Sequence, residues 1–434
     1  MRRALRWLPA LVTPLLVPAA LLAQDVSGPS FKEGDVIGYD QIESIQKYLP
    51  KEFWDNRDFF FYEGMKLTIG AAHADYSPAA AYQTATQANE GKSKLGAEGS
   101  LSGYVTGQPF PMAKVDCKAD TDAGVKIAWN FDRRWEGEGG SAKFIYSYWD
   151  RGERLPLYYE GKSRRVWLSG RVEPEYAATG GDVFRGEQRK RAYGIEVEAP
   201  FDSRGLTLLT YRYKGSQRPQ AETHNDDTWV YSPALRRVRR ISSAQRADAV
   251  AGTDFTFDDL FSFDGIIPQY GWRCLGRQEL LAPMNSRVKG YPLSEDHNFG
   301  PFGLSYADDT WDLRKAVVIE FQPRAADHPY SKKVIYIDEQ SMEPLYSFAY
   351  DRKGELWKLI WHNHRWSDDP GFPEYKGWPG VEEPRDLTPV SDTIVNVQTG
   401  TGNRIEYWDR SGTPFDSKGA LRRYIDQNRL TKGR

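Results

Sequence analysis

The sequence has no long apolar run beyond its first 22 residues, and it carries little net charge. Its 58 lysines and arginines nearly balance 60 aspartates and glutamates, which leaves a formal net charge of −2. A membrane-spanning helix needs about 18 or more predominantly apolar residues in a row, and nucleic-acid binding usually requires a strongly basic face. The rest of the chain is therefore predicted to contain no transmembrane segment and to bind no nucleic acid.

Residue patterns that mark catalysis or metal binding are also scarce. The chain has six histidines, and it contains neither an H-E-x-x-H zinc motif nor a G-x-S-x-G nucleophile elbow. Ser44 and Lys47 form an isolated S-x-x-K, which we interpret as a chance match. His362 and His364 would share one side of a strand, but such a pair points to solvent as readily as to a metal. We predict no metal site, no cofactor and no enzyme activity.

Four aspartate doublets are the strongest remaining signal for catalysis: Asp226–Asp227, Asp258–Asp259, Asp308–Asp309 and Asp368–Asp369. Two carboxylates that face each other across a cleft can hydrolyse a glycosidic bond. Adjacent residues on a strand or a turn usually point apart, however, and aspartate also caps helices. We interpret the doublets as turns or caps, with a hydrolase of envelope glycan or lipid as an alternative function.

Only two cysteines occur, Cys117 and Cys274. In an oxidising compartment they could form a disulfide. Their spacing in the sequence does not show whether they meet, so the bonded and the free states both stay open.

The N-terminus predicts the compartment. Three arginines among the first six residues precede an apolar run over Leu8–Leu22, and the small residue Ala23 stands before Gln24. This layout is typical of a bacterial secretory signal, because prolines interrupt the run and it is too short for a stable membrane span. We predict a signal peptide over residues 1–23 and a periplasmic chain over residues 24–434. That chain is expected to form a single β-rich domain, or two closely packed halves, with an N-terminal helical lead-in.

The hydrophobic periodicity predicts a mainly β protein with α-helical decorations. Helices are expected over Asp40–Leu49, from Ser77–Pro78, and near Leu421 at the end of the chain. Short strands are expected at residues 126–130, 143–149, 165–169, 195–199, 209–213, 228–231, 237–241, 317–321, 333–338, 344–350, 356–361, 394–397 and 404–408. Because short turns join successive strands, the sheet should be antiparallel.

Three stretches carry a resemblance to a known family. The segment GTDFTFDDL after the strands at 228–241 and the hairpin VIYIDEQSMEPLYSFAYD resemble outer-membrane lipoprotein-sorting proteins of the LolA/LolB superfamily. The pair GYVTGQPFP and KIAWN resembles the N-terminal half of the family called domain of unknown function 1329, and the resemblance to that family extends from about Gly34 to Ile425. The resemblance implies a large open antiparallel half-barrel, LolA/LolB-like, with helices that plug its concave face. It also implies a setting beside RND-type exporters of the Gram-negative envelope.

A half-barrel would expose an apolar face that needs a ligand or a lid. Trp229 and Tyr231 alternate on one strand and therefore share a face, and the helix at 40–49 is a candidate lid. Together with the segment that follows them, they give the predicted cavity residues Trp229, Tyr231, Phe255, Phe257, Leu260, Phe261 and Phe263. Arg237 and Arg239 lie in a strand with arginines on both faces, so they should meet solvent, a partner or an anionic headgroup.

The predicted function is a periplasmic carrier or chaperone for a lipid-like hydrophobic ligand, working with an RND-type transporter. A structural docking partner of an outer-membrane protein is the first alternative, and the hydrolase is the second. A deep apolar cavity favours the carrier, whereas a cavity filled by the protein's own side chains favours the docking partner. An aromatic groove that is open at both ends favours the hydrolase.

Overall fold

The computed structural model describes residues 28–150, 157–242, 246–288, 298–371, 381, 383–411 and 417–432. The predicted signal peptide lies outside the described residues.

Strands are the predominant regular structure of the described chain, and all of them except β3 and β4 belong to one large sheet. The strands are β1 (Val36–Ile37), β2 (Leu67–Ala72), β3 (Lys94–Leu95), β4 (Leu101–Ser102), β5 (Gly139–Asp150), β6 (Leu157–Trp167), β7 (Arg189–Ala199), β8 (Thr207–Tyr213), β9 (Asp227–Ser232), β10 (Arg237–Ile241), β11 (Tyr270–Ala282), β12 (Thr310–Pro323), β13 (Lys332–Asp338), β14 (Pro344–Tyr350), β15 (Leu356–Trp366), β16 (Leu387–Asn396) and β17 (Thr401–Ser411). The α-helices are α1 (Lys51–Asp55), α2 (Ala80–Ala88), α3 (Ala123–Asp132) and α4 (Lys418–Tyr424).

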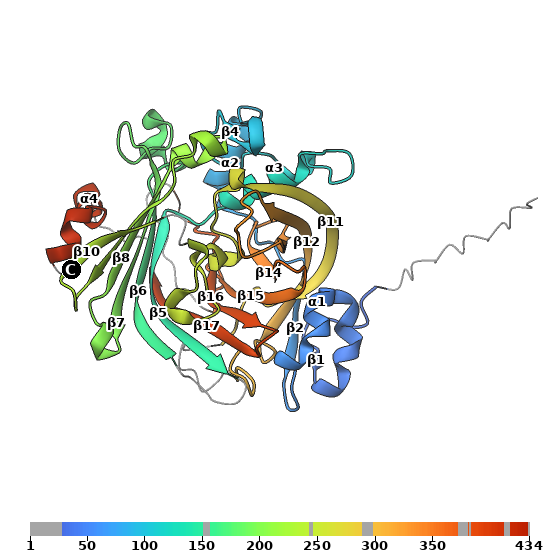
Figure 1. The fold of residues 1–434 in the computed structure, drawn as a ribbon. Coiled ribbons are helices and arrows are strands. Elements are labelled where there is room, and N and C mark those ends of the chain that lie inside the picture. Colours follow the sequence, from blue (N-terminus) through green and yellow to red (C-terminus); the bar gives the residue numbers. More distant parts are fainter. Residues whose placement is uncertain are drawn as a thin grey trace, which may run out of the picture.

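Fifteen strands form this sheet in the order β1-β2-β12-β13-β14-β15-β16-β17-β5-β6-β7-β8-β9-β10, with β11 also paired to β12. Neighbouring strands run antiparallel, except that β2 runs parallel to β12. The sheet is open and strongly curved (Figure 1). The prediction of a mainly β protein built on an open half-barrel is confirmed, with the β2–β12 pair as a parallel exception.

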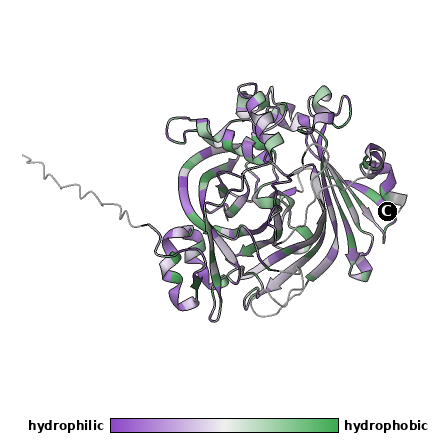
Figure 2. Cartoon of the chain, turned by 180° about the vertical axis from the view of Figure 1, so that it is seen from behind, coloured by the Kyte–Doolittle hydropathy of each residue, from purple (hydrophilic) through white to green (hydrophobic). Residues whose placement is uncertain are grey.

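Alternating residues of the long strands are buried on opposite faces of the sheet. On β15, Trp361 packs with the N-terminal segments on one face, whereas its neighbour Ile360 packs on the opposite face with Phe255 and Leu260. Val318 and Val317 of β12 divide in the same way. The period of two in side-chain direction produces this division, and the colours of Figure 2 alternate along the same strands.

The structure corrects the predicted strand at residues 126–130, which lies inside helix α3. Nearly every side chain from Val125 to Phe131 is buried, because the helix packs across β11 and β12. A short apolar run does not distinguish a buried helix from a buried strand. That ambiguity explains the error.

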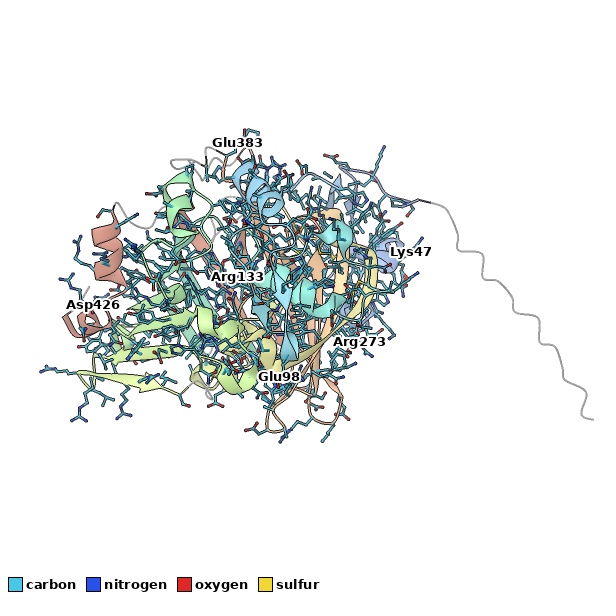
Figure 3. The ribbon with its side chains drawn as sticks, turned by 90° about the horizontal axis from the view of Figure 1, so that it is seen from above. Lys47, Glu98, Arg133, Arg273, Glu383 and Asp426 are labelled. Carbon is cyan, nitrogen blue, oxygen red and sulfur yellow. A yellow bond between two sulfur atoms is a disulfide. The ribbon has the colours of Figure 1, made fainter. Side chains whose placement is uncertain are left out.

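The helix expected over Asp40–Leu49 is a 3-10 helix, η1 (Tyr39–Tyr48), and it is not a lid. Ile42 and Ile45 pack with Phe53 of α1 in the core that also contains Trp361, on the face of the sheet opposite Ile360. The second expected helix appears as α2, which begins two residues after Pro78. In Figure 3, Lys47 in η1 and Asp426 beyond α4 mark opposite ends of the molecule. The N-terminal and C-terminal helices therefore cover different parts of the sheet.

One segment lies inside the curve of the sheet. Residues Thr253–Phe263, called here the phenylalanine segment, include the 3-10 helix η11 (Phe257–Ser262). Figure 1 shows the segment in yellow-green against the inner face of β14, β15 and β16. The predicted plug of the concave face is therefore a single irregular turn, and its position defines the site described next.

Candidate functional site

An apolar cavity of about 330 Å³ lies between the phenylalanine segment and the inner face of β17, β5, β6, β7 and β8. Apart from Ser203, its lining side chains are aliphatic or aromatic. The size is at the lower end of the roughly 300–1,000 Å³ that is typical of ligand pockets. We call this space the apolar cavity.

The strand register brings the walls of the apolar cavity together. Ile195 of β7 stands directly opposite Leu208 of β8, and both side chains line the cavity. Tyr146 of β5 is the partner of Tyr159 on β6 and of Ile405 on β17. Burial raises the pKa of Tyr146 above its ordinary value, so its phenol stays neutral at physiological pH. The wall therefore carries no charge of its own.

The phenylalanine segment contributes only part of its apolar side chains to this cavity. Phe255, Phe257 and Leu260 line it, as predicted from the sequence. Phe261 lines a separate polar pocket, where the guanidinium carbon of Arg165 lies 4.2 Å from its ring centroid. Phe263 packs in the core between α3 and β12. The left-handed backbone at Phe261, with φ of 51°, turns its ring away from the cavity.

Trp229 and Tyr231 are not part of the apolar cavity, which corrects the predicted grouping. Trp229 stands opposite Leu209 of β8, while the cavity residue Leu208 stands opposite Val230. Neighbouring residues of a strand point to opposite faces, so Trp229 lies on the outer face. There it packs against Tyr211, with ring centroids 4.9 Å apart.

The two predicted headgroup arginines are exposed. Arg239 pairs in register with Val230, and therefore lies on the same side of the sheet as the apolar cavity. Arg237 is two residues away on that side. Arg240 points to the other side and forms an ion pair with Asp227. The arginines of this strand therefore lie on both of its faces, and a partner or headgroup contact of Arg237 and Arg239 stays a prediction.

A small polar pocket of about 60 Å³ adjoins the apolar cavity, because Tyr193 and Tyr407 line both. In this pocket, Arg134 Nε donates a hydrogen bond to Glu343 Oε1 at 2.9 Å. The pocket also contains a second ion pair, in which Arg165 Nη1 lies 2.6 Å from Glu136 Oε1. Burial raises the pKa of the Glu343 carboxyl well above its ordinary value. Burial also opposes the ionisation of Glu136, yet Arg134 and Arg165 hold the pKa of that carboxyl low.

A buried carboxylate fastens the phenylalanine segment to the inner face. Asp259 accepts hydrogen bonds from Lys333 Nζ at 2.8 Å, Lys358 Nζ at 3.3 Å and the Tyr330 hydroxyl at 2.7 Å. Burial opposes the charge of Asp259, but the two lysines hold its pKa far below the ordinary value. Asp258 points away and pairs with Arg246 at 2.8 Å.

The other aspartate doublets diverge in the same way. Asp226 binds Arg212 whereas Asp227 binds Tyr213. The remaining two doublets also bind separate partners: Asp308 accepts from Lys66 N, Asp309 from Ser286, Asp368 from Ser367 and Asp369 from Asn285. In none of the four doublets do the two carboxylates face each other across a cleft, which is the arrangement that glycoside hydrolysis needs.

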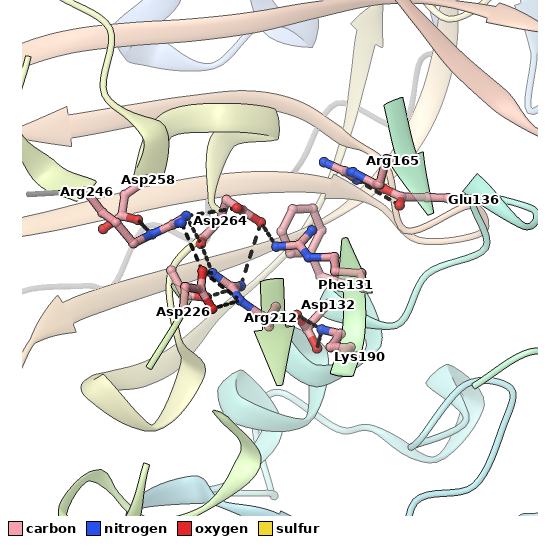
Figure 4. Close-up of polar contacts among 12 residues, drawn as sticks. Phe131, Asp132, Glu136, Arg165, Lys190, Arg212, Asp226, Arg246, Asp258 and Asp264 are labelled. Carbon is pink, nitrogen blue, oxygen red and sulfur yellow. Dashed lines mark hydrogen bonds and ion pairs between the residues drawn. The ribbon is translucent and has the colours of Figure 1, made fainter. Parts of the chain in front are cut away.

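A network of buried charges joins the end of the phenylalanine segment to β7 and β8 (Figure 4). Asp264 Oδ2 lies 2.9 Å from Arg246 Nη2, and Asp264 also pairs with Arg191 of β7. Arg212 of β8 connects it to Asp226 at 2.7 Å. The network holds the cavity strands and the segment in one arrangement, because removing one member of a buried ion pair leaves an uncompensated charge.

Ser262, His362 and Asp392 form a buried hydrogen-bonded chain that the sequence did not reveal. Ser262 Oγ is 2.7 Å from His362 Nε2, and His362 Nδ1 is 2.6 Å from Asp392 Oδ1. This is the order of a serine-hydrolase triad. Ser262, however, is 0% exposed and lines neither of the two cavities. The chain therefore serves as a second fastening of the phenylalanine segment.

Cys117 and Cys274 are joined by a disulfide in the structure. The bond links the loop before α3 to β11 across 157 residues of sequence.

Among the described residues, no cluster of three or more histidine, cysteine, aspartate or glutamate side chains has a metal-binding arrangement. No helix in the described part of the chain is long and apolar enough to cross a membrane.

A family model described as "Protein of unknown function (DUF1329)" matches residues 51–423. The chain belongs to this family. The resemblance inferred from the sequence motifs is thus confirmed. The uncharacterized protein PA3922 of Pseudomonas aeruginosa is 24% identical over 305 residues, which are 68% of this DUF1329 chain and 61% of that relative.

Solved structures with the same family or superfamily names are similar to this DUF1329 chain. A DUF1329 protein of Desulfovibrio piger has a TM-score of 0.47 at 18% identity, and the match covers 71% of this chain and 98% of that one. A putative outer membrane lipoprotein-sorting protein domain of Vibrio parahaemolyticus has a TM-score of 0.45 at 19% identity, over 72% and 98%. The LolA superfamily protein NE2245 of Nitrosomonas europaea has a TM-score of 0.36 at 12% identity, over 68% and 94%.

Proposed function

We propose that this protein is a periplasmic carrier that holds the apolar chain of a lipid-like molecule in the apolar cavity. The observation that carries the proposal is the cavity itself: about 330 Å³ of space on the inner face, walled by uncharged and largely apolar side chains. Burial of apolar surface contributes about 25 cal/mol for each Å² removed from water. An aliphatic chain in this cavity therefore gains several kcal/mol without any specific polar contact.

The polar pocket supports an amphiphilic ligand. Tyr193 and Tyr407 line both spaces, so a chain in the apolar cavity ends next to Arg134, Arg165 and Glu343. A volume of about 60 Å³ accommodates a small polar group and no large headgroup. Burial raises the pKa of the Glu343 carboxyl to about 8, which favours the protonated form, and that form is a neutral hydrogen-bond donor beside the arginines.

Two features favour a carrier over the alternatives. A docking partner without a ligand would fill the concave face with its own side chains, yet the phenylalanine segment leaves the apolar cavity unfilled. A hydrolase of glycans would need two facing carboxylates, and the aspartate doublets diverge. We further propose that the carrier has no catalytic activity of its own.

The predicted signal peptide supports a periplasmic location for this carrier, and the family resemblance suggests an RND-type exporter as the transporter it works with. Intact mass of protein purified from the periplasm checks the first statement, because cleavage before Gln24 removes residues 1–23. Co-purification with an exporter from a cross-linked envelope checks the second. A retained N-terminus would contradict the periplasmic carrier.

Binding of a fluorescent fatty-acyl probe tests the proposed ligand class. Phe257→Ala and Ile195→Ala remove half-buried cavity walls, so both variants should bind the probe more weakly while they retain the fold. Phe257→Asp should abolish binding, because an unpaired carboxylate in an apolar space is costly to desolvate. Mass spectrometry of organic extracts from native protein would identify the natural ligand.

Val238→Ala is the matched control, since Val238 is a part-buried aliphatic residue that packs on the outer face with Trp229. It should leave the affinity for the probe unchanged. Wild-type protein that binds no apolar probe would contradict the carrier and favour the docking partner.

A further inference from the structure

Two hairpin turns lie side by side at one end of the sheet. Residues 200–206 join β7 to β8, and residues 233–236 join β9 to β10. The register pairs Thr207 at the start of β8 with Tyr231 at the end of β9. A Cβ added at Gly205 would lie 3.3 Å from Pro233, so the two turns are in contact. We call them the paired tips.

Each of the paired tips exposes one large apolar side chain. Phe201 is 87% exposed and Leu235 is 53% exposed. Single exposed apolar residues are ordinary on protein surfaces. Here, however, two of the most exposed apolar side chains among the described residues lie on adjacent turns at the same end of the sheet. This placement resembles the apolar anchors of proteins that lie on a bilayer surface.

The charge around these anchors is strongly positive. Arg236, Arg237 and Arg239 lie in or directly after the second turn, and residues 232–239 contain no acidic side chain. In the first turn, Arg204 lies over the ring of Phe201, with 6.0 Å between the guanidinium carbon and the ring centroid. Asp202 is the single acid of residues 200–206. The arginines and this one acid leave an excess of three positive charges on the paired tips.

The paired tips also border the mouth of the apolar cavity. Ser203 and Leu206, both in the first turn, line that cavity together with Val197 near the end of β7. Arg237 and Arg239 lie on the cavity side of the sheet. A surface that met the tips would therefore face the opening of the cavity.

We propose that the paired tips dock this protein on an anionic lipid bilayer, with Phe201 and Leu235 inserted at the interface and the arginines on lipid phosphates. Charge complementarity selects this occupant, because each basic residue near an anionic bilayer adds to the attraction. Guanidinium groups also match phosphate geometry. This docking does not depend on whether the apolar cavity holds a ligand. In the docked protein, the mouth of the cavity would face the lipid surface.

Co-sedimentation with vesicles tests the docking. The full protein should bind vesicles of phosphatidylcholine and phosphatidylglycerol, and should bind pure phosphatidylcholine weakly. Phe201→Ser should lower the partition coefficient about tenfold or more, since its ring would no longer be buried among lipids. Arg236→Gln and Arg237→Gln should each lower it about fivefold, and added salt should weaken wild-type binding.

Matched controls lie on β11, far from the paired tips. Leu275→Ser removes a leucine that is 46% exposed, and Arg273→Gln removes an exposed arginine (Figure 3). Neither should change vesicle binding. All five side chains are exposed, and Glu320, the ion-pair partner of Arg273, keeps its second partner Lys332, so thermal melts should stay close to that of the wild type.

Wild-type protein that does not bind anionic vesicles, or controls that lose binding as strongly as the tip variants, would overturn the docking. A failed fatty-acyl probe assay with intact vesicle binding would instead reject only the carrier function.

Discussion

Two regions of the same sheet differ in what covers their faces. In the first region, strands β12 to β15 are buried on both faces, with Trp361 against the N-terminal helices and Ile360 against the phenylalanine segment. In the second region, strands β17 and β5 to β8 are covered less completely than the first region, and their inner face borders the apolar cavity. Stability is unevenly distributed in proteins, and binding sites come from the less stable parts. We therefore expect the first region to be the rigid part of the sheet and the second region to bind the ligand.

The phenylalanine segment connects the two regions, and Asp259 is its strongest link to the rigid one. Asp259→Ala should lower the free energy of unfolding by about 3–5 kcal/mol, because it leaves the buried lysines Lys333 and Lys358 without their carboxylate. Urea unfolding measures the change. Asp258→Ala, which removes a partner of Arg246, is the control and should cost less. An equal effect of the two variants would contradict the assigned roles.

A pair of aromatic truncations separates rigidity from binding. Trp361 is fully buried among Phe53, Tyr306 and Trp311, so Trp361→Ala should cost about 3–5 kcal/mol of unfolding free energy. Phe257 is half-buried in the cavity wall, so Phe257→Ala should cost less stability and weaken binding of the fatty-acyl probe. Denaturant unfolding and probe titration of both variants check this. Reversed effects would contradict the comparison between the regions.

The disulfide belongs to the rigid region, since it joins the loop before α3 to β11. Cys117→Ser with Cys274→Ser should lower the free energy of unfolding by about 2–5 kcal/mol, because the bond closes a long loop in the unfolded chain. The double variant should still bind the fatty-acyl probe. Thiol labelling of denatured, unreduced wild-type protein should find no free thiol, and two labelled thiols would refute the bond.

The sequence predicted the strands better than the helices, for a physical reason. Strand runs such as 344–350 and 356–361 alternate between two buried faces and end at clear turns, so local pattern suffices. The stretch 126–130 contains the apolar run Ile127–Trp129 between Lys126 and Asn130, and its packing on β11 accompanies a helix there. The prediction that the helix at 40–49 is a lid was wrong. Its hydrophobic periodicity predicts a buried face, but it does not indicate which face of the sheet the helix packs against.

The candidate site was predicted only in part. Phe255, Phe257 and Leu260 line the apolar cavity because they follow one another closely on the segment. The polar partners came from distant positions: His362 is 100 residues from Ser262, and Lys333 is 74 residues from Asp259. Residue spacing carries no signal for contacts that arise when a segment folds back onto a distant strand.

Titration of Glu343, which lines the polar pocket, should make the stability of the protein depend on pH. Burial raises the pKa of Glu343 to about 8, against about 4.3 in an unfolded chain. Between these values the folded state holds a proton that the unfolded state releases, so this residue makes stability fall as pH rises. Glu343→Gln should therefore gain melting temperature relative to wild type at pH 8 and little at pH 4. A constant difference across this range would contradict the raised pKa.

The smallest expected effect is the sharpest test of the two faces of the binding region. Trp229 lies on the outer face beside Tyr211 and Arg422, in a solvent-open hollow that is separate from the apolar cavity. Trp229→Ala should therefore leave the affinity for the fatty-acyl probe unchanged, whereas Phe257→Ala weakens it. Probe titration of the two variants under the same conditions makes the comparison. If Trp229→Ala weakens binding and Phe257→Ala does not, the ligand occupies the outer hollow, because the Trp229 side chain points to the outer face only and does not line the apolar cavity.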